Sequence, residues 1–284
     1  MRQTIMVTVA AASLLVIAGC KNQAASGGNT ARGSDASMRP AAAGGEAING
    51  SWKLDVNSVQ FAGKPDEYVI QNGIYTCKSC TPEYSVAADG AYHPLKMPYF
   101  DSDSVRIVDA HRVIESSKKG SKPVRVTTTT VSEDGSTSTM QFSDTSRPGS
   151  PVEGVVVKTR VGPSPAGAHA ISGQWKPSRL KSFNDGTFTS KVSGGIFQWS
   201  SPDGTSYEAK IGDGDTPLKG DIADTWVSVA KVGDNSYQVI FKRGGKVVGI
   251  NTMTVGADGK LNGVNENKEN RSFTRWAAYR FIMP

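Results

Sequence analysis

The 284-residue sequence has few of the residue types that carry most enzyme and metal chemistry. It contains only three histidines, His93, His111 and His169, and they lie far apart, so a metal-binding trio is not expected. No Gly-x-Ser-x-Gly, His-Glu-x-x-His or phosphate-loop motif occurs. Asp213 and Asp215 lack the further ligands of an EF-type calcium loop. We therefore expect no catalytic residue, no metal site and no cofactor.

Strong charge of one sign and long apolar runs are also scarce. The formal net charge is +6, and the sequence has no dense block of lysine and arginine, which argues against nucleic acid as a partner. The one long apolar run, residues 5–19, is too short and too rich in small residues for a good transmembrane helix. It has instead the length and composition of the hydrophobic part of a secretory signal.

The apolar run ends in "IAGC", which resembles the bacterial lipobox that precedes a lipidated cysteine. We expect residues 1–19 to be a lipoprotein signal peptide and Cys20 to carry a diacylglycerol and an acyl chain such as palmitate, which together anchor the protein to a lipid membrane. An ordinary secretory signal with an incidental cysteine is the alternative. Residues 20–46 contain no Val, Ile, Leu or aromatic residue and are expected to form a flexible tether. Lys21 after the cysteine favours the outer membrane of the bacterial cell envelope.

The rest of the chain contains an internal repeat. "INGSWK" at residues 48–53 returns as "ISGQWK" at residues 171–176, and "YHPLK" and "VTTTTVSEDGS" return in the same order as "DTPLKG" and "INTMTVGADGK". Matches this collinear indicate a duplication with copies long enough to be small domains. We predict a first domain over 47–164, a linker over 165–170 and a second domain over 171–284.

Each copy is predicted to be built from antiparallel β-strands. Segments such as "SVRIV", "PVRVTTTTV" and "YQVIF" alternate and are rich in β-branched residues, and turns such as "EDG" and "RGG" separate them. Only residues 57–68 and 178–186 are compatible with a short helical turn. Because an open two-faced sheet leaves exposed edges, we predict an all-β protein with two tandem up-and-down β-barrels.

The ordered set "GSWKLDVNSVQF", "YHPLK", "DSVRIVD" and "VTTTTVSEDG" resembles the lipocalin-like domains of bacterial secreted proteins. The second copy keeps the hairpin as "KRGGKVVGINTMTVGADGK" but has Pro177 where the first has Leu54. The resemblance covers nearly all of residues 47–284. It implies calycin-type barrels with an apolar interior, and it brings no known catalytic residue. In such barrels Trp52 and Trp175 are expected to plug the closed ends.

Two groups of residues are candidate sites. Cys77 and Cys80 form a Cys-x-x-Cys motif, which outside the cytoplasm is expected to be a structural disulfide, with a redox or metal role left open. Aromatic side chains at strand positions are candidate ligand contacts or simply core. They are Tyr75, Tyr84 and Tyr92 in the first copy and Phe197, Trp199, Tyr207 and Trp226 in the second.

Three functions fit these features. The favoured hypothesis is a non-enzymatic envelope lipoprotein that binds or carries a small apolar or amphipathic ligand near the membrane. The second is a structural or protein-interaction module of the envelope with filled barrels. The third is a redox role through Cys77 and Cys80.

Overall fold

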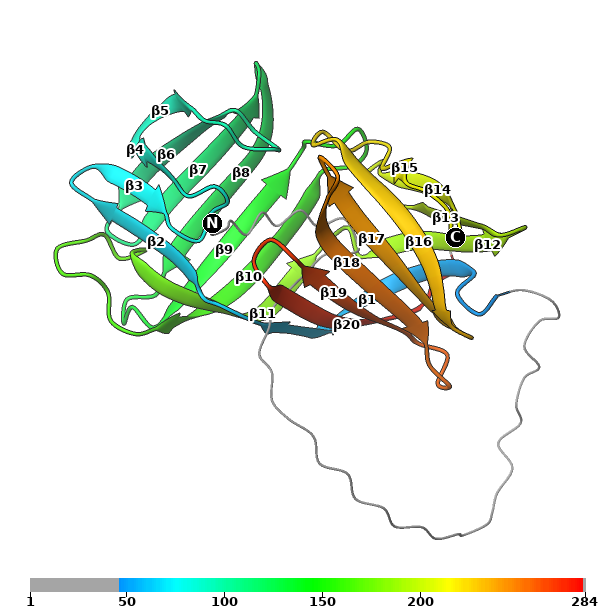
Figure 1. The fold of residues 1–284 in the computed structure, drawn as a ribbon. Helices are drawn as coiled ribbons and strands as arrows, with labels where there is room; N and C mark the ends of the chain where they lie inside the picture. The colour runs from blue at the N-terminus through cyan, green and yellow to red at the C-terminus, as the bar shows by residue number, and fades with distance from the viewer. Residues whose placement is uncertain (1–45, 283–284) are drawn as a thin grey trace, which may run out of the picture.

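The computed structural model describes residues 46–282, and all regular secondary structure in that range is β-strand, as predicted. Figure 1 shows the strands in order. They are β1 (Gly50–Ala62), β2 (Asp66–Gln71), β3 (Ile74–Cys77), β4 (Tyr84–Ala87), β5 (Asp89–Pro94), β6 (Ser102–Asp109), β7 (Arg112–Lys119), β8 (Lys122–Val131), β9 (Thr137–Asp144), β10 (Val152–Val161), β11 (Gly173–Phe183), β12 (Thr187–Ser193), β13 (Ile196–Ser200), β14 (Ser206–Lys210), β15 (Thr216–Pro217), β16 (Thr225–Gly233), β17 (Ser236–Arg243), β18 (Lys246–Val255), β19 (Leu261–Asn267) and β20 (Ser272–Arg280).

The strands form two ten-stranded antiparallel sheets, each curled into a nearly closed barrel. The first barrel consists of β2–β11, in the order β4-β3-β2-β11-β10-β9-β8-β7-β6-β5. The second barrel consists of β1 and β12–β20, in the order β14-β13-β12-β1-β20-β19-β18-β17-β16-β15. The prediction of two tandem antiparallel barrels is therefore confirmed.

The two repeats exchange their first strands. β1 belongs to the first repeat but pairs with β12 and β20 of the second, whereas β11 of the second repeat pairs with β2 and β10 of the first. Each barrel thus takes nine strands from one repeat and one from the other. The ranges 47–164 and 171–284 are sequence repeats, and each contributes one strand to the other repeat's barrel.

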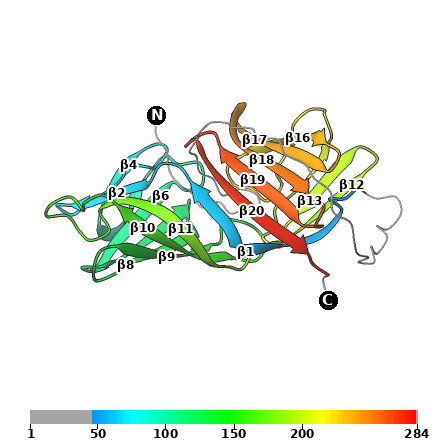
Figure 2. The same cartoon turned by 90° about the horizontal axis from the view of Figure 1, so that it is seen from below.

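The exchange explains why β1 and β11 are the longest strands. Residues 57–62 and 178–183, for which the sequence is compatible with a helical turn, continue β1 and β11 instead, so a helical turn there is wrong. The two strands contact each other where the barrels meet, in the region seen from below in Figure 2. A strand that leaves one repeat to complete the other barrel needs this extra length.

The two barrels close differently. In the second, Ser206 and Lys219 exchange two backbone hydrogen bonds of 3.1 and 2.9 Å, which join the β14 and β15 edges. Within residues 46–282 no strand pairing joins the β4 and β5 edges of the first barrel. A side-chain bond crosses this seam instead, because the Tyr84 hydroxyl donates to Asp103 Oδ2 over 3.0 Å.

A tryptophan and an arginine fix the start of each exchanged strand. In the second barrel the Trp52 ring is fully buried, its indole nitrogen donates to the Ile48 carbonyl over 2.9 Å, and the Arg280 guanidinium lies 4.6 Å from the ring centroid. Arg280 also donates to the Asn49 and Ala47 carbonyls, each at 2.6 Å. A cation over a ring face and two charge-assisted hydrogen bonds hold this strand in place.

The first barrel repeats this arrangement with residues of the other repeat. Trp175 donates to the Ile171 carbonyl over 2.7 Å, and Arg160 lies 4.1 Å from its ring centroid and donates to the Ser172 and Ala170 carbonyls. The guanidinium group of Arg160 leaves no room for a side chain at the glycine of the repeated Gly-x-Trp motif. Gly173 has φ +121°, and a Cβ there would lie 2.7 Å from the guanidinium.

A loop of the first repeat docks on the second barrel. Gly149 and Ser150 donate backbone hydrogen bonds of 2.8 and 3.0 Å to the Asp203 and Pro202 carbonyls. Arg147, itself buried, forms an ion pair with the buried Asp203 carboxylate. A Cβ on Gly149 would lie 2.3 Å from the Pro202 carbonyl oxygen, so the two backbones meet directly. The barrels are therefore joined by packing as well as by exchanged strands.

We expect Arg160→Ala to lower the free energy of unfolding by about 2 kcal/mol, because it removes the contact over Trp175 and the donors to two carbonyls. Urea unfolding followed by tryptophan fluorescence measures this. Arg179→Ala, on the exposed face of the same exchanged strand β11, is the matched control and should change stability by less than about 0.5 kcal/mol. Equal stabilities of the two variants would contradict the role of Arg160 in holding the start of β11.

Candidate functional site

The interior of the second barrel is filled with aromatic side chains. Phe197, Trp199 and Tyr207 are buried there, with ring centroids 6.1 Å apart for Phe197 and Tyr207 and 5.5 Å for Trp199 and Tyr207. Tyr237 packs on Phe197 at 5.3 Å and Phe188 on Trp199 at 6.3 Å. These contacts place the three aromatic residues singled out in the sequence within a packed core.

Two of the other candidate aromatics lie on the outside. Tyr92 on β5 is 41% exposed and has the Lys118 ammonium 3.6 Å from its ring centroid. Trp226 on β16 is 40% exposed and donates its indole N–H to Asp224 over 3.1 Å. Neither lies with the buried aromatic residues of either barrel.

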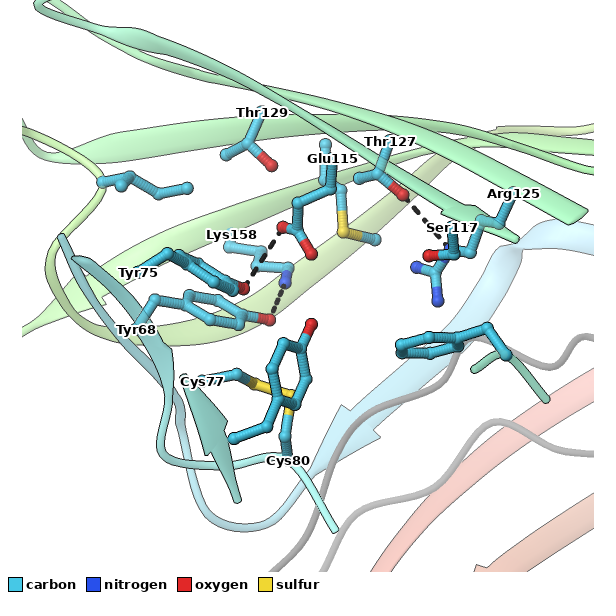
Figure 3. Close-up of a pocket in the computed structure, with 14 residues that line it drawn as sticks. Tyr68, Tyr75, Cys77, Cys80, Glu115, Ser117, Arg125, Thr127, Thr129 and Lys158 are labelled. Carbon is cyan, nitrogen blue, oxygen red and sulfur yellow. Dashed lines mark hydrogen bonds between the residues drawn. A yellow bond between two sulfur atoms is a disulfide. The ribbon is translucent and has the colours of Figure 1, made fainter. Parts of the chain in front are cut away.

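The first barrel encloses a cavity of about 40 Å³, counted as the space open to the centres of water molecules. Space of this kind holds one water per roughly 10–15 Å³, so the cavity has room for about three or four. Figure 3 shows that charged and hydroxyl groups point into it from several strands. We call it the first-barrel cavity, and its walls are Tyr68, Tyr75, Cys77, Cys80, Tyr84, Phe100, Glu115, Ser117, Arg125, Thr127, Thr129, Met140, Lys158 and Ile171.

Glu115, on β7, is the carboxylate at the cavity wall. It accepts a hydrogen bond of 3.2 Å from the Tyr75 hydroxyl of β3. Burial raises the pKa of Glu115 above its ordinary value, and Arg125, the Tyr75 bond and Lys158 only partly offset this. Arg125 is itself half-buried and donates to the Thr127 hydroxyl over 3.2 Å.

Asp103, on β6, lies fully buried directly behind the wall. Its two carboxylate oxygens accept bonds of 2.9 Å from the Ser117 hydroxyl and 3.0 Å from the Tyr84 hydroxyl. Burial, and after it the charge of Glu115, raise the pKa of Asp103 to about 7, against the lowering effect of these two bonds and of Arg125. Two carboxyl groups with raised pKa values therefore share this side of the barrel.

Lys158, in the cavity wall, forms a buried ion pair with Asp66. The Lys158 ammonium of β10 lies 2.7 Å from Asp66 Oδ2 and 3.3 Å from the Tyr68 hydroxyl, and Lys158 and Asp66 are 3% and 1% exposed. Burial alone would lower the pKa of Lys158, but Asp66 and Tyr68 outweigh it and raise that pKa. Asp66 Oδ1 is buried without a hydrogen-bond partner among the residues that the structure describes.

The strand registers allow the two barrels to be compared position by position. Asp66 pairs with Trp175 in the first barrel, whereas Phe188 pairs with Trp52 in the second. Phe188 therefore occupies the position of the buried aspartate. By the same comparison Ala278 corresponds to Lys158, Val239 to Glu115 and Trp199 to Cys77.

This comparison separates what the fold requires from what the cavity adds. Burying a charged pair loses hydration, and apolar residues of similar size are often equally or more stabilising. The second barrel has the buried apolar residues Phe188, Ala278 and Val239 at the same places. The charged groups of the first barrel are thus not needed to form a barrel of this kind.

Cys77 and Cys80 form a disulfide, as predicted, with their Cα atoms 5.2 Å apart. Both residues are buried and form part of the cavity wall. The backbone N–H groups of Lys78 and Ser79 between them donate to the Glu67 carbonyl over 3.0 and 3.3 Å. The bridge thus closes a tight turn between β3 and β4.

The remaining candidates have ordinary surface contacts. His93 lies 2.9 Å from Asp89, and His169 lies 2.7 Å from the Asp109 carbonyl. Lys210 and Lys242 donate to Asp213 and Asp215, respectively, each over 2.6 Å. No group of three or more His, Cys, Asp or Glu side chains in the described part of the chain is arranged to hold a metal ion.

The predicted membrane attachment concerns residues outside the range that the structure describes. Cys20, the expected lipidation site, lies outside the described residues. Between residues 46 and 282 no helix is long and apolar enough to cross a membrane.

Sequence reasoning found Tyr75, Tyr84 and the two cysteines but missed the charged groups beside them. A signal was available, since Glu115 stands between the buried residues Val113 and Ser117. A charge in the inward phase of an alternating strand is unusual and points to a pair or a site.

No family model, curated protein or solved structure matches this chain. The geometry of the cavity and the comparison of the two repeats are therefore the grounds for a function.

We expect the buried carboxyl groups to make stability depend on pH. A carboxyl whose pKa rises from 3.8 to about 7 on folding, as for Asp103, stabilises the protein most below about pH 4. That contribution is lost as pH rises to about 7, at up to about 1.4 kcal/mol per pH unit. Asp103→Asn should flatten the decline in unfolding free energy between pH 5 and 7. Asp215→Asn, on the surface, is the control and should show the same decline as the unmodified protein. An equal decline in both variants would contradict the raised pKa of Asp103.

Proposed function

We propose that the protein is a non-catalytic lipoprotein of the bacterial cell envelope that binds one small amphipathic molecule in the first-barrel cavity. The observation that carries the proposal is the pair of charged wall residues Glu115 and Lys158, together with Asp66, which pairs with Lys158. The second barrel has apolar residues at all three positions. Groups that are costly to bury and dispensable for the fold are best explained by a ligand that uses them.

The size of the cavity limits the ligand. About 40 Å³ accommodates only a few non-hydrogen atoms without movement, far less than the hundreds of Å³ typical of drug-sized ligands. Tyr68, Tyr84, Glu115 and Arg125 are half-buried, so they are the side chains best able to shift for a larger molecule. The charged groups would contact the polar part of the ligand, and the apolar side chains of the wall its apolar part.

The second barrel fits a supporting role. Its interior is occupied by stacked aromatic rings, and it supplies β11 to the first barrel while receiving β1. This is the observation that favours the second candidate function, a structural or protein-interaction module, at least for that half of the chain.

A redox role is less well supported. Both cysteines are bonded and buried, whereas catalytic exchange requires an accessible sulfur and a stabilised thiolate.

The envelope location rests on the sequence. The "IAGC" segment that ends at Cys20 supports lipid anchoring, and residues 21–46 would hold the barrels away from the membrane surface. The ordered Gly-x-Trp and hairpin motifs, present twice, support a kinship with bacterial lipocalin-like domains. The barrel architecture agrees with that kinship.

Native mass spectrometry of the full chain, purified from membranes in mild detergent, tests the proposal. We expect one small molecule bound per chain. The bound fraction should be unchanged in Asp185→Asn and should fall at least tenfold in Glu115→Gln. Asp185 is a matched control, because it is a buried carboxyl that also has a raised pKa but lies outside the cavity wall. A protein that carries no molecule and gains no thermal stability from a broad panel of small molecules would favour the structural module instead.

A further inference from the structure

We infer that the ligand of the first-barrel cavity carries an organic ammonium group, which lies against Glu115 and the faces of the neighbouring tyrosine rings. This inference rests on the proposed function, since it names the chemical class of the molecule bound there. It follows from the balance of charge, the orientation of the tyrosines and the contacts of the two basic residues.

The charge balance of the site is negative. Three carboxyl groups, Asp66, Asp103 and Glu115, face two cations, Arg125 and Lys158. Lys158 is neutralised by Asp66 at 2.7 Å and is held by Tyr68, so its charge is already used. Asp103 and Glu115 therefore share the one remaining cation, Arg125, and one negative charge lacks a counter-ion when all groups are ionised.

The tyrosines are oriented so that their rings form the wall. The Tyr75 and Tyr84 hydroxyls donate to Glu115 and Asp103 over 3.2 and 3.0 Å, which orients each ring beside a carboxylate. Tyr75 stacks on Tyr68 at 6.2 Å and meets Tyr84 edge-on at 6.1 Å. Figure 3 shows the Tyr68 and Tyr75 rings beside Glu115 and Lys158. Ring faces carry negative electrostatic potential, so rings next to carboxylates favour a cation.

An anion is disfavoured by the same contacts. It would need Arg125 and Lys158, but Lys158 already lies against Asp66, and the anion would meet the charges of Glu115 and Asp103. A neutral molecule would leave the repulsion between the two carboxylates unchanged. An ammonium group removes that repulsion and supplies the missing positive charge.

Binding should therefore be linked to proton release. The groups that face Glu115 are Tyr68 from β2, Tyr75 from β3, Tyr84 from β4, Asp103 from β6, Arg125 from β8 and Lys158 from β10. Of these, Asp103 and Glu115 are the ones whose protonation a nearby cation opposes, because both have raised pKa values in the free protein. An ammonium ligand should bind more tightly as pH rises from 6 to 8.

Three small probes of nearly equal size test the inference on the full chain: ethylammonium, ethanol and acetate. We expect saturable binding of ethylammonium alone, in NMR titrations of the tyrosine ring signals, with a Kd no tighter than about 1 mM because the probe has few atoms. Binding should strengthen at least threefold between pH 6 and 8. Glu115→Gln should weaken it at least tenfold, and Asp185→Asn should leave it unchanged.

One further variant and the choice of probes keep the outcomes separate. Tyr75→Phe keeps the ring and removes only the hydroxyl, so its affinity for ethylammonium should stay within about threefold of that of the unmodified protein. This variant can be measured even if Glu115→Gln proves unstable. Binding of ethanol or acetate in place of ethylammonium would overturn the inference and leave the proposed function standing. Binding of none of the three, by a protein that also carries no native molecule, would overturn both.

Discussion

The exchange of β1 and β11 is the constraint on which the rest of the structure depends. Neither barrel is complete without a strand from the other repeat, and each exchanged strand is held by an arginine that lies over a tryptophan and bonds two backbone carbonyls. The loop around Arg147 adds a direct contact between the barrels. Cooperative folding of the two barrels follows, because separating them would remove a central strand from each sheet and expose its edges.

This joint architecture allowed the two interiors to differ. Strand register keeps the barrels equivalent, yet one interior is filled by aromatic rings and the other contains an ion pair and two carboxyl groups with raised pKa values. One barrel can then supply stability while the other accommodates groups that are costly to bury. The disulfide is another difference between the two interiors, because Cys77 stands where the second barrel has the large Trp199 ring.

Much of the fold could be predicted from local patterns. Alternation of β-branched residues gave the strands, the doubled Gly-x-Trp-Lys gave the repeat, and Cys-x-x-Cys in a strand and turn context gave the disulfide. The exchange could not be predicted, because β1 and β11 begin with the same motif and either strand fits either barrel by pattern. The exchanged pairing also brings β1 and β11 into contact with each other, which the repeat pattern does not show. The charged cavity was harder to predict: alternation along β7 points to Glu115, but which strands bring Tyr75 and Lys158 beside it is known only from the strand pairing.

The most direct test of the account is to give the first barrel the interior of the second. A variant with Asp66→Phe, Lys158→Ala and Glu115→Val places the second barrel's residues at the equivalent positions. Its unfolding free energy in urea, compared with that of the unmodified protein, measures whether the charges serve the fold or a ligand. The account predicts a stability equal to or above that of the unmodified protein, since a buried ion pair is replaced by apolar residues. A loss of more than about 3 kcal/mol would contradict it and would show that the charged interior is structural.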